Sequence, residues 1–112
     1  MKEEISWSDF EKMDIRVGTV QSAEVFAGAR KPAYVLHIDF GALGVKKTSA
    51  QLTVRYAPEA LVGTQVLAVV NFPKKQIASI QSECLVLGVV GADGDVVLLR
   101  PDFGVENGLP IG

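Results

Sequence analysis

The chain has 112 residues, 48% hydrophobic and 21% charged, which suits one globular domain over residues 1–112 with a single core and no linker. One histidine and one cysteine cannot supply a histidine-paired nucleophile, a multi-histidine metal site or a disulfide, so we expect no enzyme, cofactor or metal. No apolar run approaches the roughly 18 residues of a membrane span, and Met1–Glu4 lack the apolar core of a secretory signal. We therefore expect a cytoplasmic location without membrane insertion.

The first expected elements are a short helix and a β-strand. Residues 8–11 have the serine and glutamate spacing of a capping box, which predicts a helix start there. Phe10 and Met13 could then cover one end of a barrel. Residues 14–23 are rich in Ile, Val and Thr and predict a strand, with a bulge or sharp coil at Gly18.

A second strand is expected after Pro32, with apolar and polar side chains in alternation. Residues 41–44 predict a hairpin turn into a third strand at 45–50. Pro58 near a helical start and Gly63 just past its end predict one or two helical turns after that strand. The buried face of the second strand would consist of Tyr34, Leu36, Ile38 and Phe40.

Two more strands are predicted at residues 65–70 and 83–90, and Ala92–Asp95 is a hairpin signal leading to a ribbon strand at 96–99. The expected fold is all-β: a five-stranded OB-fold barrel with short helices at the N-terminus and between strands three and four, plus a C-terminal extension. An SH3-like barrel or a small sandwich fits the same strand count.

Cys84 and His37 are interpreted as structural residues. Apolar residues follow Cys84, which indicates a buried strand, and the adjacent Glu83 would raise the pKa of a thiol if it lay close. His37 stands between two apolar residues in an alternating segment, which favours a histidine on a strand face over a metal ligand.

The net charge of −2 is distributed unevenly. Residues 30–75 contain seven basic and two acidic residues, whereas the rest of the chain contains four basic and eleven acidic ones. Loops at one rim of a barrel could bring basic pairs together and bind phosphates in a salt-dependent manner. Solvated lysines that maintain solubility are the alternative explanation. The pairs are Arg30-Lys31, Lys46-Lys47 and Lys74-Lys75.

Most aromatic side chains are expected in the core. Phe72, which precedes a proline in a loop, is the best candidate for an exposed aromatic residue. With so few exposed rings to stack on bases, any RNA ligand would be recognised by its shape and backbone.

Short motifs are distributed along nearly the whole chain. They are Asp14–Gly18, Ser49–Gln51, Tyr56-x-Pro58-Glu59, Asn71–Pro73, Ser82-Glu83 and Leu85–Gly88. With these motifs the chain resembles the small dimeric tRNA-binding domains and, within them, the CsaA group of export-related chaperones, from roughly Phe10 to Gly112. The resemblance implies an OB-fold homodimer that binds the outer corner of tRNA, as some domains appended to aminoacyl-tRNA synthetases do.

For the CsaA group, the resemblance further implies a chaperone that binds unfolded or exported polypeptides and cooperates with the translocation ATPase. Two departures from the tRNA-binding pattern favour this group. Lys74-Lys75-Gln76 replaces a run of arginines followed by glycine, which leaves fewer and less directional phosphate contacts. Cys84-Leu85 stands where tRNA-binding members commonly have Gly-Met.

If RNA binds, lysines would contact phosphates, and polar residues would donate or accept hydrogen bonds at the RNA backbone or 2′-hydroxyl. For each polar residue, a hydrogen bond at a turn or strand end is the structural alternative. The candidate RNA-binding residues are Lys46, Lys47, Ser49, Gln51, Asn71, Lys74, Lys75 and Ser82.

The C-terminal segment predicts a homodimer. Its apolar residues lie in a segment punctuated by proline and glycine, which could not easily bury them without a partner subunit. An apolar groove along the seam of such a dimer could take an extended peptide. The candidate dimer residues are Phe103, Val105, Leu109 and Ile111. The leading functional hypothesis is therefore a polypeptide-binding chaperone, with a tRNA-binding protein as the alternative.

Overall fold

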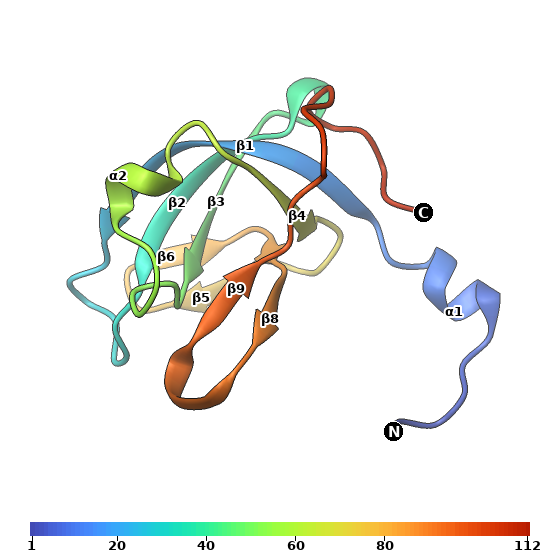
Figure 1. Cartoon of the computed structure of the whole chain (residues 1–112), viewed down its shortest axis with the longest axis horizontal. Coiled ribbons are helices and arrows are strands. Elements are labelled where there is room, and N and C mark those ends of the chain that lie inside the picture. The colour runs from blue at the N-terminus through green and yellow to red at the C-terminus, as the bar shows by residue number, and fades with distance from the viewer.

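A five-stranded antiparallel sheet coils into a nearly closed barrel in the computed structural model, which describes residues 1–112 (Figure 1). Its strands are β1 (Ile15–Val25), β2 (Tyr34–Asp39), β3 (Val45–Ala50), β4 (Gln65–Val69) and β7 (Leu85–Val86). They are hydrogen-bonded in the order β3-β2-β1-β4-β7. The expected all-β OB-fold is confirmed.

Short helices and hairpins complete the structure. The helices are α1 (Trp7–Glu11) and α2 (Pro58–Leu61), with 3-10 turns η1 (Gly41–Leu43) and η2 (Ala92–Gly94). The hairpins are β5 (Lys75–Ile77) with β6 (Ile80–Ser82) and β8 (Gly88–Val90) with β9 (Val96–Leu98). The helix expected between the third and fourth strands is present as α2. No helix is long and apolar enough to cross a membrane.

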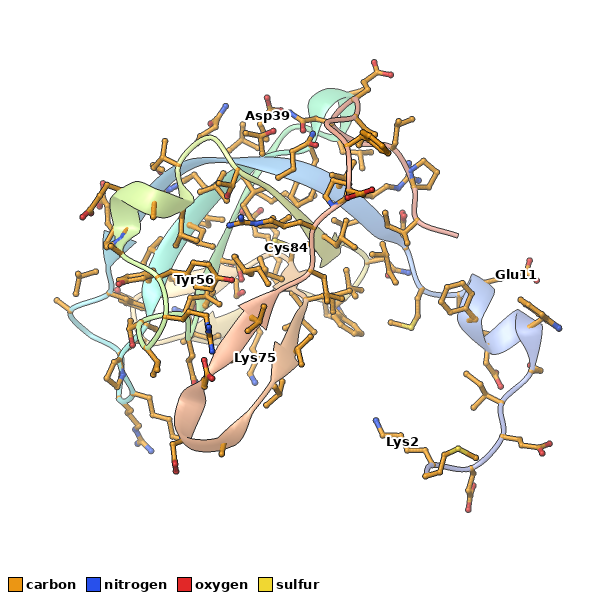
Figure 2. The ribbon with its side chains drawn as sticks, in the orientation of Figure 1. Lys2, Glu11, Asp39, Tyr56, Lys75 and Cys84 are labelled. Atoms are coloured by element: carbon orange, nitrogen blue, oxygen red, sulfur yellow. The ribbon has the colours of Figure 1, made fainter.

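The cap of the N-terminal helix is Ser6, two residues before the predicted cap at Ser8. The Ser6 hydroxyl accepts a hydrogen bond from the Asp9 amide at 3.2 Å, and the Asp9 carboxylate accepts one from the Ser6 amide at 3.1 Å. Ser8 instead lies with its hydroxyl 2.8 Å from that of Ser6. No residue of α1 is buried, and the helix extends away from the barrel, so Phe10 and Met13 do not cover a barrel end as expected (Figures 1 and 2).

The core lies inside the barrel and contains the predicted face of β2. Leu36, Ile38 and Phe40 are completely buried, while Val35 and Asp39 are only partly covered. These side chains pack against residues of the other strands and of α2, among them Leu61. The alternation of side chains along a strand thus predicted the buried face correctly.

Gly18 is required for space, whereas the bulge lies further along β1. A Cβ atom at Gly18 would lie 2.7 Å from Ile38 Cγ2 and 2.8 Å from Phe40 Cδ1, so only glycine allows β2 side chains to pack this closely. The register of β1 against β2 shifts between Val20 and Ser22. The expectation of a bulge at Gly18 is therefore wrong.

The prediction of a single strand at residues 83–90 is wrong, because the chain changes its pairing partner within this range. β7 pairs with β4, whereas β8 pairs with β9. Between them, the Leu87 amide donates to the Leu67 carbonyl at 2.9 Å, and the Leu87 carbonyl accepts from the Leu99 amide at 3.1 Å. The hairpin of β5 and β6 was not predicted.

The C-terminal segment is hydrogen-bonded to the first residues of β1, before the point where β2 begins to pair with that strand. The Gly108 amide donates to the Val17 carbonyl at 2.8 Å, and the Val17 amide donates to the Leu109 carbonyl at 3.1 Å. The Ile111 amide continues the pattern with the Ile15 carbonyl at 2.8 Å. These bonds fix part of the C-terminal extension to the barrel.

Candidate ligand-binding site

The basic pairs lie in three different parts of the barrel. They are Arg30-Lys31 in the loop between β1 and β2, Lys46-Lys47 within β3, and Lys74-Lys75 at the entry to β5. Lys46 pairs with the inward-facing Ile38 of β2, whereas Lys47 pairs with the outward-facing His37. Neighbours on a strand point to opposite faces, so these two lysines do not act as one cluster.

A groove of about 300 Å³ lies between β3, the β4–β5 connection and the β5–β6 hairpin. We call it the apolar groove. Phe72 and Leu85 form its apolar walls with Ile77 and are 52% and 50% exposed, respectively, and Lys75 contributes its one basic side chain. Its lining residues are Thr48, Ser49, Phe72, Pro73, Lys75, Ile77, Ser82, Cys84 and Leu85.

A second hollow, which we call the basic groove, adjoins the first and shares Ser49 and Ile77 with it. Arg30 and Lys31 line it, together with Gln51 from the end of β3, and no acidic residue does. Its lining residues are Gly28, Ala29, Arg30, Lys31, Ala33, Ser49, Gln51, Ile77 and Ala78.

The two grooves bring together half of the predicted RNA-binding residues. Ser49, Gln51, Lys75 and Ser82 line one or both of them. The remaining candidates, Lys46, Lys47, Asn71 and Lys74, line neither groove.

The inner end of the apolar groove is a hydrogen-bonded polar cluster. The Thr48 hydroxyl lies 2.7 Å from the Ser82 hydroxyl and 2.7 Å from the Cys84 carbonyl, and all three residues are buried. Ser82 therefore fulfils the structural alternative considered for the polar candidates. Cys84 is confirmed as a core residue near the middle of the molecule (Figure 2), and burial raises the pKa of its thiol to about 11.

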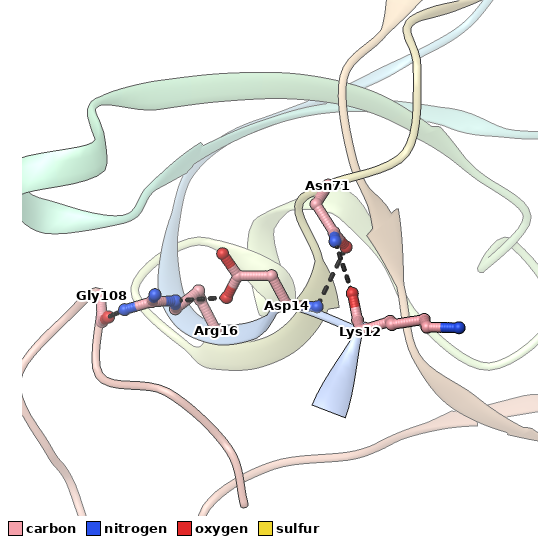
Figure 3. Close-up of polar contacts among 5 residues, drawn as sticks. All are labelled: Lys12, Asp14, Arg16, Asn71 and Gly108. Carbon is pink, nitrogen blue, oxygen red and sulfur yellow. Dashed lines mark hydrogen bonds and ion pairs between the residues drawn. The ribbon is translucent and has the colours of Figure 1, made fainter. Parts of the chain in front are cut away.

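Asn71 connects the end of β4 to the segment before β1 (Figure 3). Its Oδ1 accepts a hydrogen bond from the Asp14 amide at 3.0 Å, and its Nδ2 donates to the Lys12 carbonyl at 2.7 Å. Beside this contact, Arg16 donates to Asp14 Oδ1 at 2.6 Å and to the Gly108 carbonyl at 3.0 Å. The carbonyl and the amino group of the Asn71 side chain are thus both hydrogen-bonded to the backbone of the segment before β1.

Glu83 attaches the chain after β6 to the edge of β3. Its amide donates to the Lys47 carbonyl at 2.9 Å, and its Oε1 accepts from the Lys47 amide at 3.1 Å. Its Oε2 lies 3.9 Å from the Nζ of the exposed Lys74, a long contact that contributes little by itself. The carboxylate thereby joins strand segments where no regular pairing exists.

His37 lies on the exposed outer face of β2, as expected for a strand-face histidine. Its Nδ1 is 3.1 Å from the Ser22 hydroxyl on β1. No three His, Cys, Asp or Glu side chains lie together in an arrangement that could hold a metal ion.

Sequence reasoning missed the groove residues Leu85 and Ile77, and it named Arg30 and Lys31 only as a charge pair. Leu85 opens an apolar run, which indicates a buried strand, but β7 contains only Leu85 and Val86, and Leu85 remains half exposed. Phe72 was correctly predicted to be exposed.

The predicted dimer residues differ in how well the chain covers them. Phe103 is 78% exposed, Val105 and Leu109 are also exposed, and Ile111 is partly covered. The hydrogen bonds from β1 involve the backbone of Leu109 and Ile111, so their apolar side chains remain available to a partner.

The family described as "Putative tRNA binding domain" matches residues 15–110, which include both grooves. The chain belongs to this family. It is similar to the methionine--tRNA ligase of Porphyromonas gingivalis, with 39% identity over 106 residues, and to that of Flavobacterium psychrophilum, with 36% over 108 residues. These matches cover 95% and 96% of this chain but only 15% and 16% of the ligases.

Among solved structures, the chain is similar to two CsaA chaperones. Within the family, it is therefore of the CsaA type. That from Bacillus anthracis is 53% identical with a TM-score of 0.95, and the match covers 98% of this chain and 100% of the other. That from Picrophilus torridus is 46% identical with a TM-score of 0.91, covering 97% and 100%. A MetRS-related protein from Pyrococcus horikoshii is 25% identical with a TM-score of 0.87, covering 99% and 100%.

Proposed function

We propose that this chain is a non-catalytic, CsaA-like molecular chaperone that binds unfolded or exported polypeptides. The observation that carries the proposal is the apolar groove, where Phe72 and Leu85 leave about half of their surface exposed beside Ile77. Exposed apolar side chains gathered in a hollow suit the apolar side chains of an unfolded chain. The similarity to CsaA chaperones over nearly the whole chain supports the same function.

A second candidate function is structure-specific binding to the outer corner of tRNA. The basic groove supports it, because Arg30 and Lys31 lie there without an acidic neighbour in the lining, and Lys75 lies in the adjoining groove. The family's description supports it as well. The contacts proposed for tRNA are Arg30, Lys31, Lys46, Lys47, Ser49, Gln51, Lys74 and Lys75, whereas Asn71 and Ser82 use their polar groups within the protein.

The proposal includes a homodimer as the binding unit and the translocation ATPase as a further partner. The fully exposed helix α1 and the exposed Phe103 support a subunit interface formed by the two ends of the chain. The proposed location is the cytoplasm, where tRNA and polypeptides awaiting export both occur.

The test is a pair of binding titrations, by fluorescence anisotropy, with labelled tRNA and with labelled, reduced and carboxymethylated lactalbumin as a permanently unfolded polypeptide. Each is performed at about 50 and 200 mM salt, the range over which phosphate contacts lose most of their affinity. Leu85→Ser removes an apolar wall, and the double variant Arg30→Ala/Lys31→Ala removes the basic one. Leu85→Ser leaves the basic groove intact and therefore serves as the control for tRNA binding.

The chaperone proposal predicts that the affinity for the polypeptide changes much less with salt than the affinity for tRNA. It also predicts that Leu85→Ser weakens polypeptide binding about tenfold, because the leucine side chain that the bound polypeptide would cover is lost. The tRNA alternative predicts binding that falls steeply with salt and is largely lost in the Arg30→Ala/Lys31→Ala variant. Retained tRNA binding without any polypeptide binding would overturn the chaperone proposal.

A further inference from the structure

We infer that the edge of β3 at Ser49 binds an extended polypeptide as an added β-strand, with an apolar side chain in the apolar groove and an acidic side chain in the basic groove. This inference rests on the proposed polypeptide-binding function and specifies how that site takes its ligand.

The first supporting observation is that β3 ends the five-stranded sheet, so its outer edge has no regular ladder partner, although β6 and β7 lie against it. The Lys47 carbonyl accepts a hydrogen bond from the Glu83 amide, and the Lys47 amide donates to the Glu83 carboxylate, so both backbone groups of Lys47 point away from β2. Backbone groups alternate along a strand, and Ser49, two residues further on, therefore faces the same way. None of the backbone hydrogen bonds outside the strand ladders involves Ser49.

The backbone carbonyl of Ser49 has only one side-chain neighbour that could compete with a ligand, the Thr48 hydroxyl. The Thr48 hydroxyl lies 3.3 Å from the Ser49 carbonyl, but it has a closer acceptor in the Cys84 carbonyl at 2.7 Å. The Ser49 carbonyl can therefore accept a hydrogen bond from a ligand. Unpaired amides and carbonyls on a strand edge bind another extended chain.

The second observation is that both grooves meet at Ser49, which lines each of them. In an extended peptide, side chains two positions apart lie on the same face and about 7 Å from each other. A peptide paired to Ser49 could therefore direct one side chain toward Leu85 and another toward Arg30. Adjacent pockets for alternate side chains provide the specificity of strand addition.

The charges of the two grooves define the chemistry of the partner. Lys75 lies in the apolar groove, Arg30 and Lys31 lie in the basic one, and neither lining contains an Asp or Glu. The nearby Glu83 carboxylate already accepts a backbone hydrogen bond and lies near Lys74. A segment with an apolar residue and an acidic residue two positions apart is thus the complementary ligand.

The inference is tested with a fluorescein-labelled octapeptide in which serines alternate with larger residues, including a leucine and a glutamate two positions apart. Ser49→Pro removes the edge amide, and Val45→Pro is the matched control because Val45 faces the same edge outside both grooves. We expect Ser49→Pro to weaken peptide binding about tenfold, the effect of one lost hydrogen bond, and Val45→Pro to leave it within about twofold. Circular dichroism and thermal unfolding establish that both variants are folded.

A second measurement leaves the protein unchanged and methylates the peptide amides one at a time. Strand addition predicts an alternating pattern, in which every second methylation weakens binding about tenfold and those between have little effect. Replacing the glutamate with lysine should also weaken binding. A pattern without alternation, together with binding that Leu85→Ser still weakens about tenfold, would overturn strand addition and leave the proposed function intact. No peptide or lactalbumin binding at all would overturn both.

Discussion

Ala78 adopts a backbone conformation that suits glycine better. Its φ is +49°, and it occupies the first position of the two-residue turn between β5 and β6, where Ile77 pairs with Ile80. Positive φ brings a Cβ atom close to the backbone at a cost of about 1 kcal/mol. The hydrogen bond from Gln76 Nε2 to the Ala78 carbonyl, at 2.8 Å, helps to hold this turn.

We therefore predict that Ala78→Gly raises the free energy of unfolding by about 0.5–1 kcal/mol, because relief of the positive φ outweighs the added freedom of the unfolded chain. Urea denaturation measures the change. Ser79→Gly is the control: Ser79 does not have a positive φ, so its replacement should lower stability or leave it unchanged. A lower stability of Ala78→Gly would contradict this account of the turn.

The buried thiol of Cys84 makes stability depend on alkaline pH. Burial raises its pKa from 9.0 to about 11, so the unfolded chain loses this proton at a lower pH than the folded protein does. The stabilisation associated with the neutral thiol is fully present below pH 9.0 and is lost as pH rises toward about 11.

We predict that the stability of the wild type, measured relative to that of Cys84→Ala, falls by about 1 kcal/mol between pH 8 and pH 10. Urea denaturation of both proteins at each pH isolates this contribution, because all other titrating groups are shared. A constant difference across this range would show that the folded and unfolded thiols titrate alike.

At the scale of elements, Asn71 determines how the N-terminal segment leaves the barrel. Its side-chain amide is hydrogen-bonded to the backbone N–H of Asp14 and to the carbonyl of Lys12 (Figure 3). The preceding helix α1 has no buried residue. We predict that Asn71→Ala lowers the free energy of unfolding by about 1 kcal/mol and exposes residues 1–13 to faster proteolysis.

Asn71→Asp is the comparison variant: it keeps the acceptor for the Asp14 amide but places a carboxylate oxygen against the Lys12 carbonyl, so it should lower stability at least as much as Asn71→Ala does. Limited proteolysis followed by mass spectrometry measures the cleavage rate. If Asn71→Ala left both cleavage and stability unchanged but weakened tRNA binding, Asn71 would be a ligand contact and not an anchor.

The sequence predicts some elements of this barrel better than others, for physical reasons. β2 was predicted with its buried face because the whole strand alternates between core and surface. The hairpin of β5 and β6 was missed because its strands have three residues each and are largely polar. The change of partner at Leu87 could not be predicted either, since it depends on which strands lie nearby and not on local composition.

The same distinction applies to the candidate site. Ser49, Gln51 and Lys75 could be predicted because polar and basic residues at strand ends tend to be exposed. Leu85 could not, because an apolar residue in an apolar run indicates burial, and its exposure follows from the short pairing of β7. The division into an apolar and a basic groove arises only when the β5–β6 hairpin lies opposite β3.

At the scale of the whole molecule, the two ends of the chain carry apolar surface that the barrel does not cover. Trp7 is 84% exposed on a five-residue helix that extends away from the barrel, and Phe103 is exposed in the C-terminal segment (Figure 1). A helix this short does not persist in water without tertiary contacts. A second subunit that buries α1 would explain both its formation and its apolar residues.

We therefore predict that the protein sediments as a homodimer at micromolar concentration, at twice the 12.0 kDa of one chain. Trp7→Ser and Phe103→Ser should each shift the equilibrium toward the monomer by at least about tenfold, since a buried aromatic side chain contributes several kcal/mol at an interface. Val62→Ser is the matched control, because Val62 is an exposed apolar residue beside α2, on the side of the barrel away from α1 (Figure 1). A 12.0 kDa wild-type species in sedimentation equilibrium would instead require that α1 form without a partner and would exclude this interface.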